Sequence, residues 1–322
     1  MLFDLASLTK PLVTAPLAFE HLDLDRDWAS ELGFKDWPGP ITPRLLLSHA
    51  AGLPPWLPYT GESVAEQVAN FQAWASHPLL RKAAWGESTY SDIGFRLLAE
   101  ILEIAAGRDW RAMGEELSGL SAAPWAECPI SMPPGADMDA WGLATDTPFP
   151  PQHPSLPHDA NARAGMKGHA GFGATPESAA NWLEKWNKKY PKLMAIETNK
   201  SNDGQIWGLG LQRLRAGQGS FAELLNRLAT KGPSVIADEG TDEPLPAPSH
   251  VPAAPSEWWF HLGYTGPALF VRPSDGACIL LLCNRLKNAS QLLNVEELRA
   301  RRWQLLEKAC GNTDSNSKLN QH

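Results

Sequence analysis

Strand-forming patterns in this chain of 322 residues gather in its last third. Runs rich in β-branched, aliphatic and aromatic residues cover Trp207–Leu214, Trp258–Leu262, Ala268–Arg272 and Ala277–Cys283. The turn-forming sequence Pro273-Ser274-Asp275-Gly276 separates the last two runs, so they predict an antiparallel hairpin. The runs together favour one antiparallel sheet near the C-terminal end.

Helical patterns dominate the first two thirds. The clearest runs from Asp92 to Ala106, where an apolar stripe follows one side and Gly107 stands at the stop position. Further helices are predicted at about 8–21, 62–76, 176–188, 221–229 and 295–308. We therefore expect an α+β fold in one domain, 1–322: a mostly helical lobe of roughly 40–200, and an antiparallel sheet of roughly 205–310 flanked by helices that include 8–21. Residues 311–322 are expected to form a disordered tail.

Composition excludes some partners. A formal net charge of -8, a pI near 5.6 and the lack of a Lys/Arg cluster work against nucleic-acid binding. No apolar run reaches the length of a membrane span, and residues 1–20 lack the features of a secretion signal, so the chain as written is expected to be cytoplasmic. The four cysteines, Cys128, Cys278, Cys283 and Cys310, are expected to be reduced, and Cys278 and Cys283 should point to opposite faces of one strand.

Ser7-Leu8-Thr9-Lys10 places a hydroxyl and an ammonium group on one helical turn. A serine hydroxyl is a poor nucleophile until a neighbouring base or cation lowers the cost of removing its proton. A Ser-x-x-Lys match arises by chance roughly once in a chain of this length. Taken alone, Ser7 is more simply a helix cap and Lys10 a solvated residue, so the weight of the pair depends on the motifs that accompany it.

Three further motifs follow in order. They are Tyr90-Ser91-Asp92 before the predicted buried helix, Gly168-His169-Ala170-Gly171-Phe172, and His261-Leu262-Gly263-Tyr264-Thr265-Gly266 on a predicted strand. With Ser7–Lys10, this series resembles the serine β-lactamase and penicillin-binding-protein superfamily, in particular its class C β-lactamase-like esterase branch. Leu46–Pro54, His158–Ala162 and Leu281–Arg285 resemble further segments of that family, so the resemblance covers nearly the whole chain.

The resemblance implies a serine hydrolase. Ser7 would attack a small-molecule ester, amide or lactam, Tyr90 would act as general base, and water would hydrolyse the acyl-enzyme, with no cofactor and no metal. Lys10 would lower the pKa of Tyr90, and Asp92, where antibiotic-processing members carry asparagine, would keep Lys10 charged. Without the family, the commoner role for Tyr90 is a half-buried tyrosine that donates to a backbone carbonyl, and Asp92 could simply cap the helix that follows it.

His261-Leu262-Gly263 stands where the superfamily often has Lys-Thr-Gly. Gly263 would let substrate lie against the strand. The resemblance implies that the backbone N–H groups of Ser7 and Tyr264 form the oxyanion hole. Histidine offers a substrate carboxylate a weaker field than a permanent cation does, which favours neutral or less acidic esters over β-lactams. The alternative for His261 is a water-exposed histidine at a strand end.

The remaining histidine and loop patterns predict architecture. His49, His158 and His169 match no metal-ligand spacing. The resemblance implies that they shape loops around the active site. Residues 168–173 are expected to form a tight turn there. The Pro-rich stretches 148–157 and 237–255 are expected to be loops, and the acidic second one is a candidate for a mobile flap or a solvated insertion.

The N-terminal end departs from the family pattern. Relatives carry a helix and two or more strands before the Ser-x-x-Lys helix, whereas six residues precede Ser7 here. N-terminal strands therefore appear missing from the expected sheet, and the apolar run Ile279–Leu282 should lie at an unpaired edge, which predicts marginal stability or edge-to-edge pairing. In a truncated gene model, a periplasmic or secreted location would replace the cytoplasmic one.

Two other functions stay open at this stage. One is a D,D-peptidase or β-lactamase that acts on cell-wall-like amides or lactams, and the other is a catalytically silent, penicillin-binding-like binding module. Retention of Ser7, Lys10, Tyr90 and His261 argues against the silent module, because a silent site has no chemical need for all four. None of these motifs indicates an oligomeric state.

Overall fold

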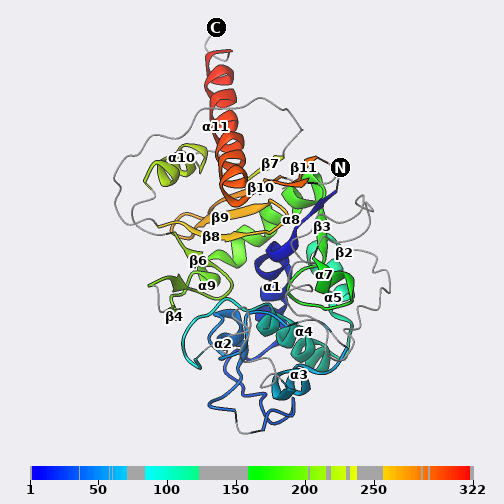
Figure 1. The fold of residues 1–322 in the computed structure, drawn as a ribbon. Coiled ribbons are helices and arrows are strands. Elements are labelled where there is room, and N and C mark those ends of the chain that lie inside the picture. Colours follow the sequence, from blue (N-terminus) through cyan, green and yellow to red (C-terminus); the bar gives the residue numbers. More distant parts are fainter. Residues whose placement is uncertain are drawn as a thin grey trace.

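The computed structural model describes residues 2–35, 37–57, 59, 61–70, 84–122, 159–201, 204–214, 219–229, 233–237, 257–283, 286–288 and 291–319 (Figure 1). Its helices are the 3₁₀ turn η1 (Ala6–Leu8), the π-helical turn η2 (Lys10–Thr14), α1 (Ala15–His21), α2 (Pro43–Leu47), α3 (Val64–Asn70), α4 (Asp92–Ala106), α5 (Trp110–Ser118), α7 (Ala160–Arg163), α8 (Pro176–Lys189), α9 (Pro191–Met194), α10 (Gly219–Ala229) and α11 (Val295–Leu319). Its strands are β1 (Phe3–Asp4), β2 (Ser121–Ala122), β3 (Phe172–Ala174), β4 (Asn199–Lys200), β5 (Ile206–Trp207), β6 (Gln212–Arg213), β7 (Ser234–Ala237), β8 (Trp259–Leu262), β9 (Ala268–Arg272), β10 (Ala277–Leu282), β11 (Leu286–Asn288) and β12 (Gln291–Leu292). The predicted α+β class is confirmed.

Seven strands of the described residues form the main sheet, in the order β4-β5-β6-β8-β9-β10-β7. The predicted hairpin is β9 and β10, which pair antiparallel. Side chains alternate across β10: Cys278 lies in one apolar core, and Cys283, which follows the strand, lies in the other, as predicted. Both are buried, as is Cys310, while Cys128 lies outside the described residues. Figure 1 shows α10 and α11 on one side of this sheet and α8 on the other.

The prediction that the run Ile279–Leu282 lies at an unpaired edge of this sheet is wrong. β7 pairs in parallel with β10 from Ile279–Ser234 to Leu282–Ala237, so the apolar run at 279–282 is buried between two neighbours. The sequence Ser-Val-Ile-Ala of β7 is too short for its pattern to predict a strand. Its pairing partner, β10, lies more than forty residues further along the chain. The predicted loop at 237–255 therefore begins at the last residue of β7, and residues 238–255 lie outside the described part.

Helix α4 has the predicted bounds, and the expected local signals set them. The Ser91 side chain accepts a hydrogen bond from the Gly94 N–H at 3.0 Å and so caps the N-terminus. Gly107 ends the helix at φ 64°, in the left-handed region. The apolar stripe is buried from Ile93 to Leu102 against the rest of the helical lobe, where α4 packs on α1, α2 and η2, whereas Ala105 is exposed. The tyrosine and the carboxylate of the second motif therefore flank a rigid helix end.

The predicted helix at 8–21 is not a continuous α-helix. It begins as the 3₁₀ turn η1, passes through the π-helical turn η2 and becomes α-helical at Ala15. Pro16 has no N–H to donate, so carbonyls in the preceding turn lose a partner. The indole N–H groups of Trp186 and Trp182, both on α8, donate instead to the Pro11 and Leu12 carbonyls at 2.9 Å each.

Other boundaries also differ from the predictions. The predicted strand 207–214 is two short strands, β5 and β6, because Gly208 and Gly210 form a turn between them; Gly210 has φ 96°. The helix predicted at 62–76 is described from Val64 to Asn70, and residues 71–83 lie outside the described part. α11 continues to Leu319, into the predicted disordered tail. No helix among the described residues has the length and apolar character needed to span a membrane.

Candidate active site

Ser7 lies in a strained turn between β1 and η2. The preceding Ala6 has φ 44°, in the left-handed region that a residue with a side chain rarely adopts. The Asp4 carboxylate accepts a hydrogen bond from the Ala6 N–H at 2.8 Å, and the Phe172 carbonyl accepts one from Leu5 at 3.0 Å. These two bonds hold the turn in place. Ser7 is partly exposed, whereas its neighbours Ala6 and Leu8 are buried.

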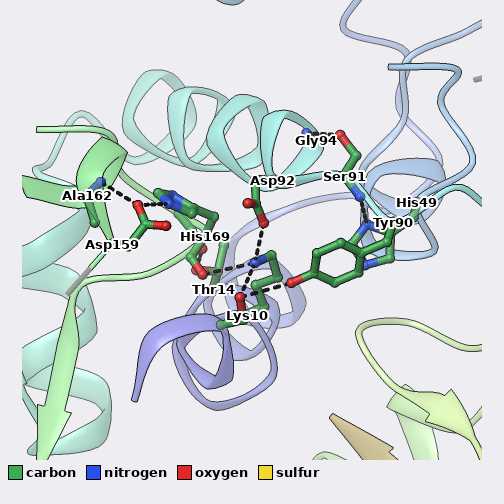
Figure 2. Close-up of polar contacts among 12 residues, drawn as sticks. Lys10, Thr14, His49, Tyr90, Ser91, Asp92, Gly94, Asp159, Ala162 and His169 are labelled. Atoms are coloured by element: carbon green, nitrogen blue, oxygen red, sulfur yellow. Dashed lines mark hydrogen bonds and ion pairs between the residues drawn. The ribbon is translucent and has the colours of Figure 1, made fainter. Parts of the chain in front are cut away.

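Lys10 is fully buried beneath Ser7, with three oxygen partners (Figure 2). Its Nζ lies 2.7 Å from Asp92 Oδ1, 3.0 Å from Ser7 Oγ and 3.1 Å from the His169 carbonyl, which accounts for the three N–H bonds of an ammonium group. Burial by itself lowers the pKa of Lys10, but Asp92 and Tyr90 outweigh burial, and the pKa lies above its usual value of 10.5. Lys10 is therefore a charged ammonium at neutral pH.

Tyr90 approaches Ser7 from the other side. Its hydroxyl lies 2.9 Å from Ser7 Oγ, and the Lys10 ammonium lies 5.0 Å from the centre of its ring. The sequence predicts a lowered pKa for Tyr90, and this is wrong. Burial and the Asp92 charge raise the pKa of Tyr90 by more than Lys10 and Ser7 lower it. Because Asp92 balances the charge of Lys10, the resting phenol is neutral.

Asp92 is the first residue of α4, and it does not cap that helix. The cap is Ser91, so the Asp92 carboxylate is available to Lys10, while its backbone N–H donates to the Pro55 carbonyl at 2.8 Å. Its position in the first helical turn favours a negative charge there. The expected pairing of Asp92 with Lys10 is thus present in the structure.

His49 packs against the ring of Tyr90, a contact that sequence reasoning missed. Its Nδ1 accepts a hydrogen bond from the Ser91 N–H at 3.0 Å, and its ring lies 4.7 Å from the rings of Tyr90 and Trp207. Burial, with a contribution from Lys10, holds the pKa of His49 well below its usual value, so the ring is neutral. The only available signal was the Leu46–Pro54 resemblance, which indicated a loop near the site without this role.

His261 lies on β8 and is buried, not exposed at a strand end. Its exposed fraction is 4%, and its ring centre is 5.9 Å from that of Tyr90. Burial and the neighbouring Lys10 charge lower the pKa of His261 to about 3. The ring is therefore neutral near pH 7, and it brings no positive charge to the site.

Gly263 and Tyr264 begin the turn between β8 and β9, and this turn packs on the chain that leads to Ser7. A Cβ at Gly263 would lie 2.9 Å from the Leu5 carbonyl and 2.7 Å from Pro267, so a larger residue has no room. The Thr265 hydroxyl donates to the Asp4 carbonyl at 2.9 Å. Close packing inside the protein, rather than the approach of substrate, explains this glycine. An oxyanion hole formed by Ser7 and Tyr264 stays a prediction.

The segment around His169 holds Lys10 from the side opposite Tyr90 (Figure 2). The His169 Nε2 lies 2.9 Å from Asp159 Oδ1, an oxygen that also accepts a hydrogen bond from the Ala162 N–H at 2.8 Å. Burial by itself raises the pKa of Asp159, but His169 and the Ala162 N–H lower it to about 2. The tight turn predicted at 168–173 is shorter than expected: the chain bends at 168–170, with Gly168 at φ 89°, but Phe172 and Gly173 belong to β3. His158 lies outside the described residues.

Comparisons with known proteins agree on the fold. The Beta-lactamase family model matches residues 1–301, and no curated protein matches the chain. A class C beta-lactamase structure aligns with a TM-score of 0.52 at 16% identity over 97% of this chain and 82% of that chain. A class C beta lactamase from Rhodobacter sphaeroides gives 0.50 at 20% over 95% and 85%. SurE with D-Leu gives 0.50 at 20% over 96% of this chain and 64% of its own.

Proposed function

Because the chain belongs to the beta-lactamase family, whose members include serine hydrolases, we propose that it cleaves an ester or amide bond through an acyl-enzyme on Ser7. One observation carries this proposal. Ser7 is partly exposed, and its Oγ lies 3.0 Å from a buried ammonium group and 2.9 Å from a phenol hydroxyl. A serine that only caps a helix needs neither neighbour, whereas a nucleophile needs both a proton acceptor and a means of stabilising negative charge.

In the proposed acylation step, Ser7 Oγ forms a bond to the carbonyl carbon of the substrate. The reaction starts from the minor form in which the Tyr90 phenol has lost its proton to solvent, and Lys10 stabilises that phenolate. The Ser7 proton passes to the phenolate oxygen as the bond forms, so negative charge moves from Tyr90 through Ser7 to the substrate oxygen. The tetrahedral intermediate collapses, the bond to the leaving group breaks, and the leaving group takes the proton. Ser7 then carries the acyl group as an ester.

In the proposed deacylation step, a water molecule takes the place of the leaving group. The Tyr90 phenolate accepts a proton from this water while the water oxygen bonds to the acyl carbon, and the Ser7 oxygen then leaves and takes that proton from Tyr90. Lys10 keeps its own proton throughout, because Asp92 at 2.7 Å favours the ammonium form. Lys10 therefore acts by its charge, and Tyr90 carries the proton.

The surroundings of Ser7 support a neutral substrate. His261 is uncharged near pH 7, and Lys10 is buried with its charge balanced by Asp92. Neither side chain therefore offers a substrate carboxylate an exposed cation, which a carboxylate-bearing lactam would need for tight binding. We propose that neutral esters or amides are hydrolysed faster than β-lactams.

A fluorophosphonate probe tests the nucleophile, because it forms a covalent adduct with an activated serine. We expect the native protein and the matched control Ser63→Ala to be labelled, since Ser63 is an exposed residue that contacts Glu66. Ser7→Ala should not be labelled, and Tyr90→Phe should be labelled at least about 100-fold more slowly, as expected for loss of a general base. Labelling that survives Ser7→Ala would exclude Ser7.

A substrate panel tests the proposed preference. We expect short-chain nitrophenyl esters to be hydrolysed with burst kinetics, and a chromogenic cephalosporin to be turned over more slowly. Faster turnover of the cephalosporin, or release of D-alanine from a D-alanyl-D-alanine peptide without ester turnover, would favour the lactamase or peptidase alternative. A folded protein that reacts with neither the probe nor any substrate would favour the silent binding module.

A further inference from the structure

The turn between β8 and β9 is held from behind by Arg302, a residue of α11 that no motif singled out. Its Nη2 donates to the Gly263 carbonyl at 2.9 Å and to the Pro267 carbonyl at 3.3 Å, and its Nε donates to the Gly266 carbonyl at 2.7 Å. One guanidinium group therefore contacts three carbonyls of a single short turn. That turn contains Tyr264, whose N–H is expected from the family resemblance to form the oxyanion hole together with that of Ser7.

The contact with Gly263 sets the direction of the Tyr264 N–H. The Gly263 carbonyl and the Tyr264 N–H belong to the same peptide unit, which is planar and trans, so the two groups point in opposite directions. Arg302 and the Gly266 N–H, at 3.1 Å, both bind the Gly263 oxygen. Fixing that oxygen toward α11 turns the Tyr264 N–H away from α11.

The same turn also packs on residues 4–5, just before Ser7, through Gly263 and Thr265. Thr265 Oγ1 donates to the Asp4 carbonyl at 2.9 Å, and the Gly263 backbone lies against the Leu5 carbonyl. The turn is therefore held between α11 on one side and residues 4–5 on the other. This arrangement fixes the peptide of Tyr264 relative to the strained turn that carries Ser7.

A guanidinium group also changes the strength of the N–H donor. A charged donor on the carbonyl oxygen polarises the peptide unit, and a polarised unit has a stronger N–H donor. The planar fork of arginine binds two or more carbonyls in a fixed geometry, which the single ammonium of lysine does not. Position and polarisation both favour negative charge on the substrate oxygen in the transition state.

We propose that Arg302 is a positioning residue for the oxyanion hole, which acts by fixing and polarising the Gly263–Tyr264 peptide. The proposal rests on the proposed function, since it assumes acyl transfer at Ser7. It predicts that Arg302 influences the reaction without contact to the substrate.

The kinetic test compares nitrophenyl esters with the matching thiono esters, because sulfur is a poor acceptor of the hydrogen bonds that an oxyanion hole supplies. For Arg302→Met we expect kcat/KM on the oxygen ester to fall by about 10- to 100-fold, a fraction of the loss caused by removing an oxyanion donor outright. The ratio of oxygen-ester to thiono-ester rates should fall with it. Arg302→Lys keeps the charge and loses the planar fork, so its kcat/KM and its rate ratio should lie between those of the native protein and of Arg302→Met. Arg299→Met is the control, since Arg299 is exposed on the same helix and pairs with Glu296.

A second measurement does not depend on activity. Amide hydrogen exchange should be at least about 10-fold faster across residues 263–267 in Arg302→Met than in the native protein or in Arg299→Met, because three hydrogen bonds to this turn are lost. Unchanged exchange, or a fall in rate with an unchanged oxygen-to-thiono ratio, would overturn the proposal for Arg302. A native protein that the fluorophosphonate probe does not label at Ser7 would instead overturn the proposed function, whatever the exchange rates.

Discussion

The buried ion pair of Lys10 and Asp92 gives the sharpest test of the site's construction. Lys10 is fully buried and Asp92 is 16% exposed, with 2.7 Å between the charged atoms. A pair at this distance attracts by roughly 6 kcal/mol at an effective dielectric constant of about 20. Moving each ion out of water costs several kcal/mol. The pair as a whole therefore contributes little to the free energy of unfolding, although each ion depends strongly on the other.

This balance predicts the outcome of a double-mutant cycle. Asp92→Asn leaves a buried ammonium without its counter-ion, so we expect the free energy of unfolding to fall by about 3 kcal/mol or more at pH 7. Lys10→Met should cost less, because the partly exposed Asp92 can be hydrated. The double variant, with both charges removed, should lose less than the sum of the two by about 2 kcal/mol or more.

The cycle is measured by urea unfolding followed by circular dichroism, and Glu296→Gln with Arg299→Met forms the control cycle. That pair is more than 70% exposed on both sides, so its coupling should be below about 1 kcal/mol. Since the folded-state pKa of Lys10 is raised, its stabilising contribution is present below about pH 10.5 and is lost as the pH rises through the folded value. Additive costs for Lys10 and Asp92, or a loss below 1 kcal/mol for Asp92→Asn, would refute this reasoning.

Two further substitutions test the segment that holds Lys10. Gly168→Ala would place a Cβ 2.0 Å from the Phe95 carbonyl at φ 89°, so we expect the free energy of unfolding in urea to fall by roughly 3 kcal/mol. The control is Gly107→Ala, which also has a positive φ but open space around it, and it should cost about 1 kcal/mol. Asp159 has a lowered folded pKa of about 2, so its contribution of about 2 kcal/mol is present above pH 4 and is lost as the pH falls through 2. Asp159→Asn should therefore destabilise the protein at pH 7 and much less at pH 2.5, and an equal effect at both pH values would contradict this.

Features encoded within a few residues were predictable from the sequence. The bounds of α4 follow from the Ser91 cap, the apolar stripe and Gly107, all of which lie inside or next to the helix. The opposite directions of Cys278 and Cys283 follow from the two-residue period of a strand. In each case, neighbouring residues alone determine the geometry.

Features that depend on distant partners were not predictable in the same way. The π-helical turn at Lys10–Thr14 is stable because indole groups from α8 satisfy its carbonyls, and those residues lie more than 150 positions away in the sequence. β7 forms because the edge of β10 is available to it. A local pattern carries no information on either partner, so an ordinary helix and an open edge were the natural expectations.

In the candidate site, too, the features set by local motifs were predictable and those set by the surroundings were not. Ordered motifs were sufficient to bring Ser7, Lys10, Tyr90 and Asp92 together, since each motif specifies its own local geometry. The direction of the Tyr90 pKa shift was not predictable, because it is a difference between the effect of burial and the effects of two opposite charges. His261 differs for the same reason, since only its surroundings distinguish a buried neutral ring from an exposed one.

The charge balance of the resting site constrains how it can work. Lys10 and Asp92 cancel, and His261 and Tyr90 are neutral near pH 7, so Ser7 has no strong base beside it before substrate binds. Negative charge must therefore appear in two places in turn, first on Tyr90 when its phenol loses a proton to solvent, and then on the substrate oxygen. In the proposed mechanism Lys10 stabilises the first of these charges, and the amide of the turn held by Arg302 stabilises the second. A site with no net charge at rest gains from donors that are fixed in advance, because each then favours the transition state more than the substrate.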